Sequence, residues 1–249
     1  MFLFQSPPPT RYDLNFSLAG IRIRVHPLFW LLAIFLGSGS GDILQILIWV
    51  LVVFVSIVVH EMGHALAFRN FGVNSHIVLH FMGGLAIPES APWGTDYANV
   101  SPTPRQQVLI SLAGPFAGFL LAILVVAGAR LSGGEIAGTM LGFIPVPQLA
   151  TLSFLGSVLN IFIRWMLLVN IFWGLINLLP VFPLDGGQVA RSVLIQYDPL
   201  DGARKSIWLS TITGAVIALA AFFLLNSIYM ALLFGILAFQ SYQSLGARY

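Results

Sequence analysis

Long apolar runs, separated by short polar or glycine- and proline-rich segments, organise the chain. Four of them reach the roughly 17–25 residues that a membrane-spanning helix needs: Ile43–Phe71, Gln106–Arg130, Ile161–Leu178 and Ile207–Leu225. Two shorter runs, Leu28–Leu36 and Ile228–Phe239, have the same character. The pattern predicts an all-α membrane protein with about six transmembrane helices.

Three segments between these runs do not follow the helical pattern. Phe16–Val25 alternates loosely between apolar and basic residues, which favours a short strand or a surface segment. Ile77–Ile87 contains a Gly-Gly pair and is expected to be an extended, membrane-associated β segment. Gly133–Pro147 is expected to be a loop, and the apolar residues between it and Ile161 a re-entrant or interfacial piece.

Composition supports the membrane class. Hydrophobic residues make up 58% of the 249 residues and charged residues only 8%, whereas soluble domains average about 25% charged residues. The net charge is +2 and the basic residues are scattered, so the sequence predicts no nucleic-acid partner. The absence of cysteine excludes disulfides, thiolate metal ligands and a cysteine nucleophile. Three prolines at positions 7–9 stand where a signal peptide is apolar, so no cleaved signal is expected.

The basic residues also indicate an orientation. If the N-terminus is cytoplasmic, six spans place nine of the eleven Lys and Arg residues on the cytoplasmic side, with Arg130 and Arg164 as the exceptions. This bias follows the positive-inside rule. We therefore expect an integral multi-pass protein of the cell membrane with both termini in the cytoplasm. The end of the second span, near Arg69, would face the cytoplasm.

Three ionisable residues interrupt the second apolar run. The sequence HEMGH at residues 60–64 has the HExxH pattern and follows an uncharged stretch at 46–59. Ionisable side chains at membrane depth are costly and indicate a functional site. His60 and His64 are one helical turn apart, so both imidazoles can hold one Zn²⁺. Glu61 is offset by about 100° around the helix and can act as a general base on a water molecule at the metal.

A third metal ligand must come from another part of the chain, because a catalytic zinc site commonly has three protein ligands and an open position for water. Asp185 is the best candidate, since two prolines before it break the helix and let its carboxylate point inward from irregular backbone. Asn177 ends the fourth span, and its amide could stabilise an oxyanion. Another type of membrane zinc site would use a downstream glutamate as its third ligand, for which Glu135 is the candidate. We expect metal ligands at His60, His64 and Asp185, catalytic roles for Glu61 and Asn177, and one Zn²⁺ per chain.

The combination of the two motifs resembles the site-2 protease family of intramembrane zinc metalloproteases. The family signature pairs HExxH on one transmembrane helix with a downstream N-x-x-P-x-x-P-x-D-G. This chain matches the signature at His60, Glu61, His64, Asn177, Pro180, Pro183, Asp185 and Gly186. Gly20–His26 and Ser111–Pro115 are also similar to the family, and the resemblance covers about residues 20–195.

The resemblance implies a zinc metalloendopeptidase that cleaves within or near the transmembrane segments of membrane proteins, as in regulated intramembrane proteolysis. It also implies that His60, His64 and Asp185 bind zinc and that Glu61 is the catalytic glutamate. A single domain, 1–249, would contain a catalytic core at about 43–195 and two additional C-terminal spans at about 206–245. The expected partners are membrane-spanning protein or peptide substrates, the lipid bilayer and a separate regulatory protein. Many relatives carry PDZ or CBS domains for regulation, and neither is expected in these 249 residues.

Alternatives remain open for several residues. The chain could instead be a non-proteolytic membrane metal-binding protein or transporter, although a pure ligand site has no need of Glu61. The extended segment at 77–87 could hold substrate as an added strand, or form a membrane-surface hairpin without substrate contact. Four other polar residues have expected structural roles: His26, His76 and His80 as structural or interfacial residues, and Asn170 as a packing residue between helices. Glu89 is expected to be a solvated loop charge.

Overall fold

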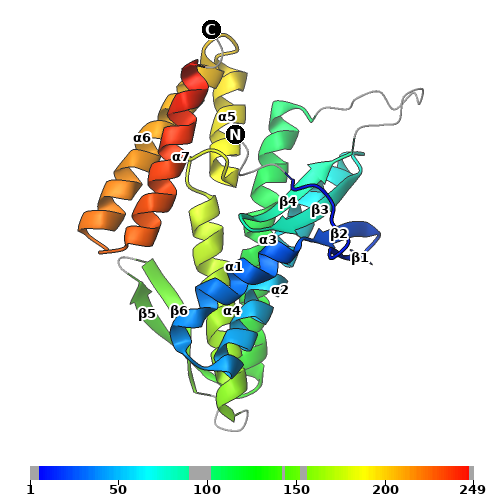
Figure 1. Ribbon diagram of the computed structural model, residues 1–249, viewed down its shortest axis with the longest axis vertical. Coiled ribbons are helices and arrows are strands. Elements are labelled where there is room, and N and C mark those ends of the chain that lie inside the picture. The colour runs from blue at the N-terminus through cyan, green and yellow to red at the C-terminus, as the bar shows by residue number, and fades with distance from the viewer. Residues whose placement is uncertain (1–5, 90–101, 142–143, 152–155, 247–249) are drawn as a thin grey trace. The chain divides into compact units, whose positions relative to one another are not determined.

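The computed structural model describes residues 6–89, 102–141, 144–151 and 156–246 of the chain (Figure 1). Its helices are α1 (Pro27–Gly37), α2 (Ile43–Asn70), α3 (Pro104–Leu131), α4 (Gly156–Asn177), α5 (Asp185–Tyr197), α6 (Gly202–Phe223) and α7 (Ile228–Gly246). Its strands are β1 (Leu14–Leu18), β2 (Ile21–Val25), β3 (Ser75–His80), β4 (Gly83–Pro88), β5 (Glu135–Leu141) and β6 (Ile144–Thr151). A short 3-10 helix, η1 (Ser38–Ser40), follows α1.

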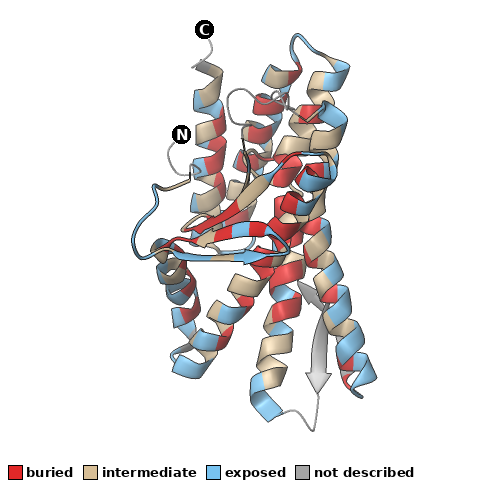
Figure 2. Ribbon diagram, turned by 90° about the vertical axis from the view of Figure 1, so that its right-hand side faces the viewer, coloured by how far each residue is buried: buried red, intermediate tan, exposed pale blue. Residues whose placement is uncertain are grey.

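Five of these helices, α2, α3, α4, α6 and α7, are long and apolar enough to cross a membrane. Only 22–33% of the residues in their most apolar windows are buried, and exposed residues occur along the helices in Figure 2. Many of those exposed residues are large and apolar. Apolar surface of this extent indicates lipid rather than water around it. The chain is therefore a mostly helical, multi-pass membrane protein, as predicted.

The remaining predicted span corresponds to α1, which is too short to cross a bilayer as a helix. Its 11 residues extend about 16 Å at ~1.5 Å per residue, roughly half of a ~30 Å hydrocarbon core. α1 runs alongside the first half of α2, because Phe29 and Trp30 at its start contact Phe54, and Gly37 at its end lies against Trp49. The count of six spans stays a prediction.

The predicted strand at residues 16–25 is a hairpin of two strands. β1 and β2 pair antiparallel across a two-residue turn, in which Ala19 and Gly20 have φ values of 49° and 78°. β2 then pairs in parallel with β3, and β3 pairs antiparallel with β4. The strand order β1-β2-β3-β4 leaves β4 at an edge of the sheet. The segment predicted to be extended at 77–87 is therefore a hairpin of two strands, with a turn at residues 81–82.

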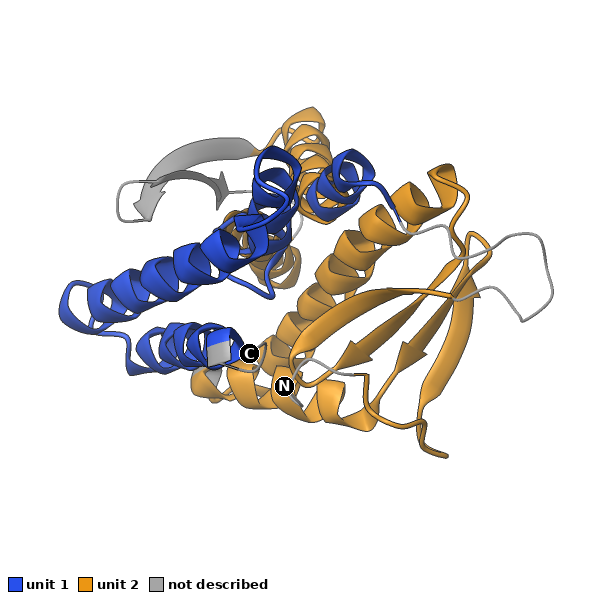
Figure 3. Cartoon of the chain, turned by 90° about the horizontal axis from the view of Figure 1, so that it is seen from above, with its two compact units in different colours: residues 1–4, 101–112, 176–249 blue, residues 5–100, 113–175 orange. Residues whose placement is uncertain are grey.

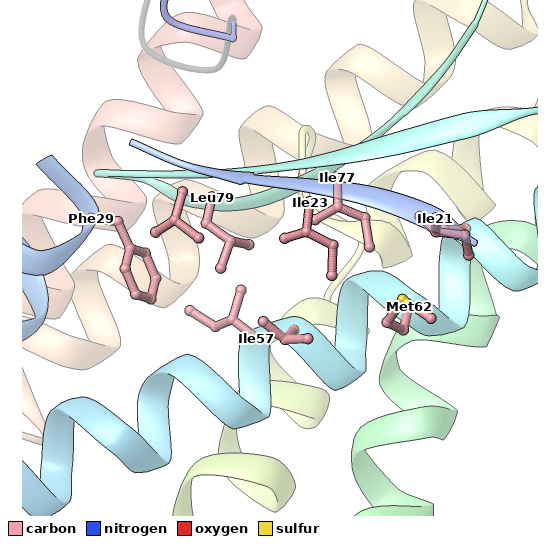
Figure 4. Packing of buried hydrophobic residues seen from close by; sticks show 10 residues of the cluster. Ile21, Ile23, Phe29, Ile57, Met62, Ile77 and Leu79 are labelled. Atoms are coloured by element: carbon pink, nitrogen blue, oxygen red, sulfur yellow. The ribbon is translucent and has the colours of Figure 1, made fainter. Parts of the chain in front are cut away.

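One face of this sheet packs on the second half of α2 (Figure 4). The contact is buried and apolar, and it comprises Ile21, Ile23, Val25, Phe29, Ile57, Val58, Met62, Ala65, Ile77 and Leu79. Alternate residues of β2 and β3 point at the helix, as the period of two along a strand requires. Burying each such side chain contributes about 1.5–3 kcal/mol. The sheet is thus held firmly against the helical turns that carry residues 60–64.

The chain divides into two compact units (Figure 3). One unit contains residues 5–100 and 113–175, and the other contains residues 1–4, 101–112 and 176–249. The first unit holds the four-stranded sheet, α1 and α2, and most of α3 and α4. The second unit holds α5, α6 and α7.

In the second unit, α6 packs closely on both of its neighbours. Its small residues Gly202, Ser206, Ser210 and Gly214 recur at every fourth position and are all buried. A Cβ atom on Gly202 would lie 2.2 Å from the carbonyl oxygen of Leu194 in α5. A Cβ atom on Gly214 would meet the backbone of α7 at 3.3 Å. Small residues at this spacing let helix backbones approach each other in membranes.

The expected loop at residues 133–147 contains a second, two-stranded sheet. β5 and β6 pair antiparallel over their whole length. Pro145 and Pro147 indicated a loop because proline cannot donate to a ladder, but both strands of a two-stranded sheet are edges and tolerate it. α4 then begins at Gly156, so the expected re-entrant piece is part of β6 and of α4, and its residues 152–155 lie outside the described ones.

Candidate active site

α2 carries the HExxH residues, and His60, Glu61 and His64 are all buried. The Nε2 atoms of His60 and His64 lie 3.2 Å from each other. Two nitrogens bound to one tetrahedral Zn²⁺ at roughly 2.0–2.1 Å would lie about 3.3–3.4 Å apart. The two imidazoles therefore have the separation that a shared metal ion requires.

α3 passes directly over these imidazoles at a glycine. A Cβ atom on Gly114 would lie 2.2 Å from Nε2 of His64 and 2.8 Å from Nε2 of His60. α2 presents a glycine to α3 in the same way, since a Cβ atom on Gly63 would lie 2.4 Å from the carbonyl oxygen of Ala113. α2 and α3 therefore approach each other closely at these two glycines. Backbone rather than side chain fills the space beside the histidines.

β4 approaches Glu61 just as closely. A Cβ atom on Gly84 would lie 2.3 Å from Cγ of Glu61 and 2.6 Å from its Oε1. On its other side Gly84 pairs with Leu79 of β3. No described strand pairs with the opposite edge of β4. The Glu61 side chain therefore lies against the backbone of an edge strand.

A polar contact joins α2 to α4 one turn before His60. Asn170 donates from Nδ2 to Oγ of Ser56 at 2.9 Å and to the carbonyl oxygen of Met166 at 2.8 Å. Ser56 and Asn170 are both buried. Interhelical hydrogen bonds of this kind hold transmembrane helices together. The predicted packing role of Asn170 is confirmed.

Asp185 is the first residue of α5, and the loop before it folds back onto that turn of the helix. A Cβ atom on Gly186 would lie 2.1 Å from the carbonyl oxygen of Leu178, and one on Gly187 would lie 2.5 Å from the backbone nitrogen of Phe182. Only glycine permits such an approach of two backbones. The proline-broken segment is therefore closely packed, and Asp185 is buried.

The first turn of α5 is also tied to the start of α3. Gln107 donates from Nε2 to Oε1 of Gln188 at 3.2 Å and to Oγ of Ser111 at 3.3 Å. Because Gln188 follows Asp185 by one helical turn, this bond limits rotation of the turn that carries Asp185. Neither glutamine stands out in the sequence, because Gln107 follows Arg105 and Gln106 at the polar start of α3 and Gln188 lies among other polar residues of α5.

His60 and His64 in the first unit and Asp185 in the second are all buried, and each offers one atom that can bind a metal ion. Two imidazole nitrogens and one carboxylate oxygen are a donor set of catalytic zinc sites with three protein ligands. Asn177 is buried at the last position of α4. The side chain of Glu135 lies outside what the structure describes.

Two further histidines support the sheet and its connection to α1. His26 caps α1, and its Nδ1 accepts a hydrogen bond from the backbone nitrogen of Leu28 at 3.2 Å. His80 is buried at the end of β3. Burial, together with the charges of His26 and Arg24, lowers the pKa of His80. The expected structural roles of His26 and His80 are confirmed.

Glu89 is held by ion pairs and is not a freely solvated loop charge. Its Oε1 lies 3.3 Å from Nδ1 of His76 and also pairs with Arg22. Its side chain is 31% exposed. The expected loop charge is thus ion-paired as well as partly exposed, because the parallel pairing of β2 with β3 brings Arg22 and His76 close together.

A buried HExxH helix within an apolar span defines the class of membrane-embedded metallopeptidases. The model of peptidase family M50 matches residues 48–221, which is more than half of the chain, and the chain belongs to this family. The resemblance to site-2 proteases that the two sequence motifs indicated is thereby confirmed.

Individual relatives agree with the family. A zinc metalloprotease of Methanocaldococcus jannaschii is 29% identical over 183 residues, which are 72% of this chain and 44% of that protein. A relative from Synechocystis sp. is 32% identical over 160 residues, which are 64% of this chain and 34% of that protein. The chain thus spans less than half the length of these curated relatives.

A solved structure shares the fold. The site-2 protease from Methanocaldococcus jannaschii matches with a TM-score of 0.55 at 24% sequence identity. The match covers 93% of this chain and 94% of that chain. The arrangement of apolar helices and short strands is therefore one that a membrane protease is known to adopt.

Proposed function

We propose that the chain is a zinc-dependent endopeptidase that hydrolyses peptide bonds within or near the transmembrane segments of other membrane proteins. The observation that carries this proposal is the buried pair of His60 and His64 with Glu61 beside them, in an apolar helix of 28 residues. A site that only binds metal has no need of a carboxylate next to its first histidine. The name of the M. jannaschii relative supports zinc as the metal.

In the proposed reaction, Glu61 moves the proton. His60, His64 and Asp185 would hold a zinc ion, which supplies a Lewis acid for the scissile carbonyl and lowers the pKa of a water molecule. The Glu61 carboxylate takes a proton from the attacking water and returns it to the leaving amine. A carbon–oxygen bond forms and the carbon–nitrogen bond breaks. Burial keeps bulk water away, which strengthens every charge interaction at the site.

The segment from Asn177 to Asp185 would complete the site. The close packing of Gly186 and Gly187 against the preceding loop supports a fixed position for the Asp185 carboxylate. The side-chain amide of Asn177 can donate a hydrogen bond to the oxyanion that develops on the scissile carbonyl.

The edge strand β4 would hold the substrate backbone. A transmembrane helix satisfies its own amides, so it must unwind before a peptide bond can be attacked. An unwound segment added alongside β4 would regain its main-chain hydrogen bonds. The contact of Gly84 with Glu61 supports this arrangement, because it brings the strand to the catalytic carboxylate. Substrates with glycine, proline or polar residues near the cleavage position would unwind most readily.

Gly84→Ala is expected to lower kcat/KM roughly 10²-fold, because a misplacement of about 1 Å near the reacting groups has an effect of that size. The new methyl carbon would overlap the Glu61 side chain, so β4 or Glu61 must move. Cleavage of a purified single-span substrate measures the effect, and metal analysis should find zinc retained. Leu85→Ala is the control, since side chains alternate along a strand and Leu85 points to the other face. Equal activity of the two variants would contradict the role of this contact.

We also propose an orientation in the cell membrane. Arg69 in the last turn of α2 and the excess of basic residues on one side support an active site toward the cytoplasm, with both termini cytoplasmic. β2 and α1 together would make the first crossing, because they accompany α2 along its length. The single domain 1–249 would then comprise a catalytic core at about 43–195 and two further spans at about 206–245.

The substrates would be membrane-spanning proteins or peptides, such as membrane-tethered transcription regulators or remnant signal peptides. Their cleavage would belong to regulated intramembrane proteolysis. A separate regulatory protein would control access, and nucleic acid is not expected as a partner.

Asp185→Asn is expected to weaken zinc binding by more than ~10-fold, since even disturbing an outer-shell partner of a metal ligand costs about 10–100-fold. Glu135→Gln is expected to leave zinc binding unchanged. Chelator competition with the purified full-length protein measures both affinities, and cleavage of a panel of single-span substrates measures activity in the same preparations. Loss of zinc from Glu135→Gln with zinc retained in Asp185→Asn would reverse the ligand assignment. Absence of cleavage by the zinc-loaded wild type across the whole panel would count against the peptidase function.

A further inference from the structure

The last two membrane helices enclose the loop that carries Asp185. Val181 of this loop is fully buried in a cluster with Phe234 and Leu237 of α7. Ile217 and Ala218 of α6 pack against the same cluster. The two C-terminal helices are thus part of the surroundings of the proposed third metal ligand, although the sequence assigns them no motif.

One backbone N–H group of this loop donates its hydrogen bond to a residue outside the loop. Leu179, Val181 and Leu184 donate to carbonyl groups within their own segment, and the two prolines have no N–H to donate. Phe182 donates instead to Oγ of Ser210 on α6, at 3.0 Å. Ser210 is 2% exposed, so bulk water cannot replace this acceptor without opening the structure.

We infer that Ser210 is a positioning residue for the third metal ligand. The inference rests on the proposed function, in which Asp185 binds zinc. The Ser210 hydroxyl fixes the backbone of Phe182, and that backbone lies directly against Gly187 in the first turn of α5. A shift of Phe182 would therefore move the turn that begins at Asp185. Through this hydrogen bond α6 acts on the turn that carries the proposed ligand.

Ser210→Ala removes the acceptor and leaves the buried N–H of Phe182 unpaired. Zinc affinity, measured by chelator competition with the full-length protein, is expected to fall about 10-fold, the lower end of the range for groups that orient a metal ligand. Amide exchange at Phe182 should be faster in the metal-free variant than in metal-free wild type. Ser210→Thr keeps the hydroxyl and should restore the affinity.

Ser206→Ala is the matched control, because Ser206 is also buried on α6 but its hydroxyl bonds to Ala203 within the same helix. Wild-type affinity in Ser210→Ala overturns the inference, and so does an equal loss in Ser206→Ala. If Ser210→Ala does not fold, Ser210→Thr and Ser210→Val, which differ by one hydroxyl, carry the same comparison.

Asp185→Asn separates this inference from the proposed function. Zinc lost from Asp185→Asn but retained in Ser210→Ala would refute the positioning role alone. Zinc retained in Asp185→Asn would refute the ligand assignment and the role of Ser210 with it.

Discussion

Replacing Glu61 by glutamine is expected to lower kcat by about 10²–10⁴-fold, the usual contribution of a general acid–base group, while zinc stays bound. The amide keeps the shape of the carboxylate but cannot take the proton of the attacking water. His60 and His64, one turn apart on the same helix, are left unchanged. Cleavage of a single-span substrate by the purified variant measures the loss, and metal analysis of the same sample measures the zinc.

His60→Ala is the comparison for this variant, because it should lose both zinc and activity. Wild-type cleavage by Glu61→Gln would contradict the proposed mechanism. If every cellular effect of the protein survived Glu61→Gln but not His60→Ala, the chain would be a metal-binding protein or transporter. Intact substrate that accumulates with Glu61→Gln would instead identify the natural partner.

Local geometry made several features predictable from the sequence. The spacing of His60 and His64 fixes their common face on any helix, and the structure has their Nε2 atoms 3.2 Å apart. The long apolar runs correspond to α2, α3, α4 and α6 within a few residues at each end. Prolines before Asp185 end one helix, and the next helix begins at that residue. Each of these depends on residues close together in the chain.

Contacts between distant segments could not be predicted in this way. Gly84 and Gly114 are ordinary glycines in the sequence, and their approach to Glu61 and His64 depends on how β4 and α3 dock against α2. The hydrogen bond of Ser210 could not be predicted either, because nothing near this residue in the chain indicates that its partner lies in the loop before Asp185. Docking of elements is decided by packing, which a single sequence does not display.

The missed strands have local physical reasons. Ala19 adopts a positive φ in the first hairpin turn, where asparagine, aspartate or glycine would have been the usual signal. Pro145 and Pro147 argued against a strand, but they occur in a two-stranded sheet without a central strand. α1 looked like a complete, short transmembrane helix because β2, the strand just before it, is apolar only at alternate positions. The apolar run therefore began only at α1.

Three glycines lie at the closest contacts between the HExxH helix and its neighbours. Gly63, Gly84 and Gly114 are the points at which α2, β4 and α3 come within contact of one another or of the site's side chains. The consequence is that backbone, which cannot rotate away as a side chain can, sets the positions of the histidines and of the glutamate. A methyl group added at one of these glycines would therefore displace a side chain of the site or a neighbouring backbone segment.

Gly114→Ala is therefore expected to weaken zinc binding roughly 100-fold or more, since displacing a ligand exceeds the 10–100-fold cost of disturbing its outer-shell partner. The added carbon would lie 2.2 Å from Nε2 of His64, so the imidazole must leave its position or α3 must move away from α2. The change cannot act by weakening α3, because alanine favours a helix over glycine by about 1 kcal/mol. Chelator competition measures the affinity, and thermal unfolding of the metal-free protein measures the stability.

Gly118→Ala on the same helix is the matched control. A Cβ atom there would meet only Asn170, at 3.5 Å, which is an ordinary van der Waals contact. Both variants gain the same helix propensity, so a difference between them in zinc affinity reports the contact with the histidines and nothing else. Equal zinc affinity in Gly114→Ala and Gly118→Ala would mean that α3 does not lie over the metal site. A loss confined to Gly114→Ala would make this glycine as necessary to the site as the histidines that it faces.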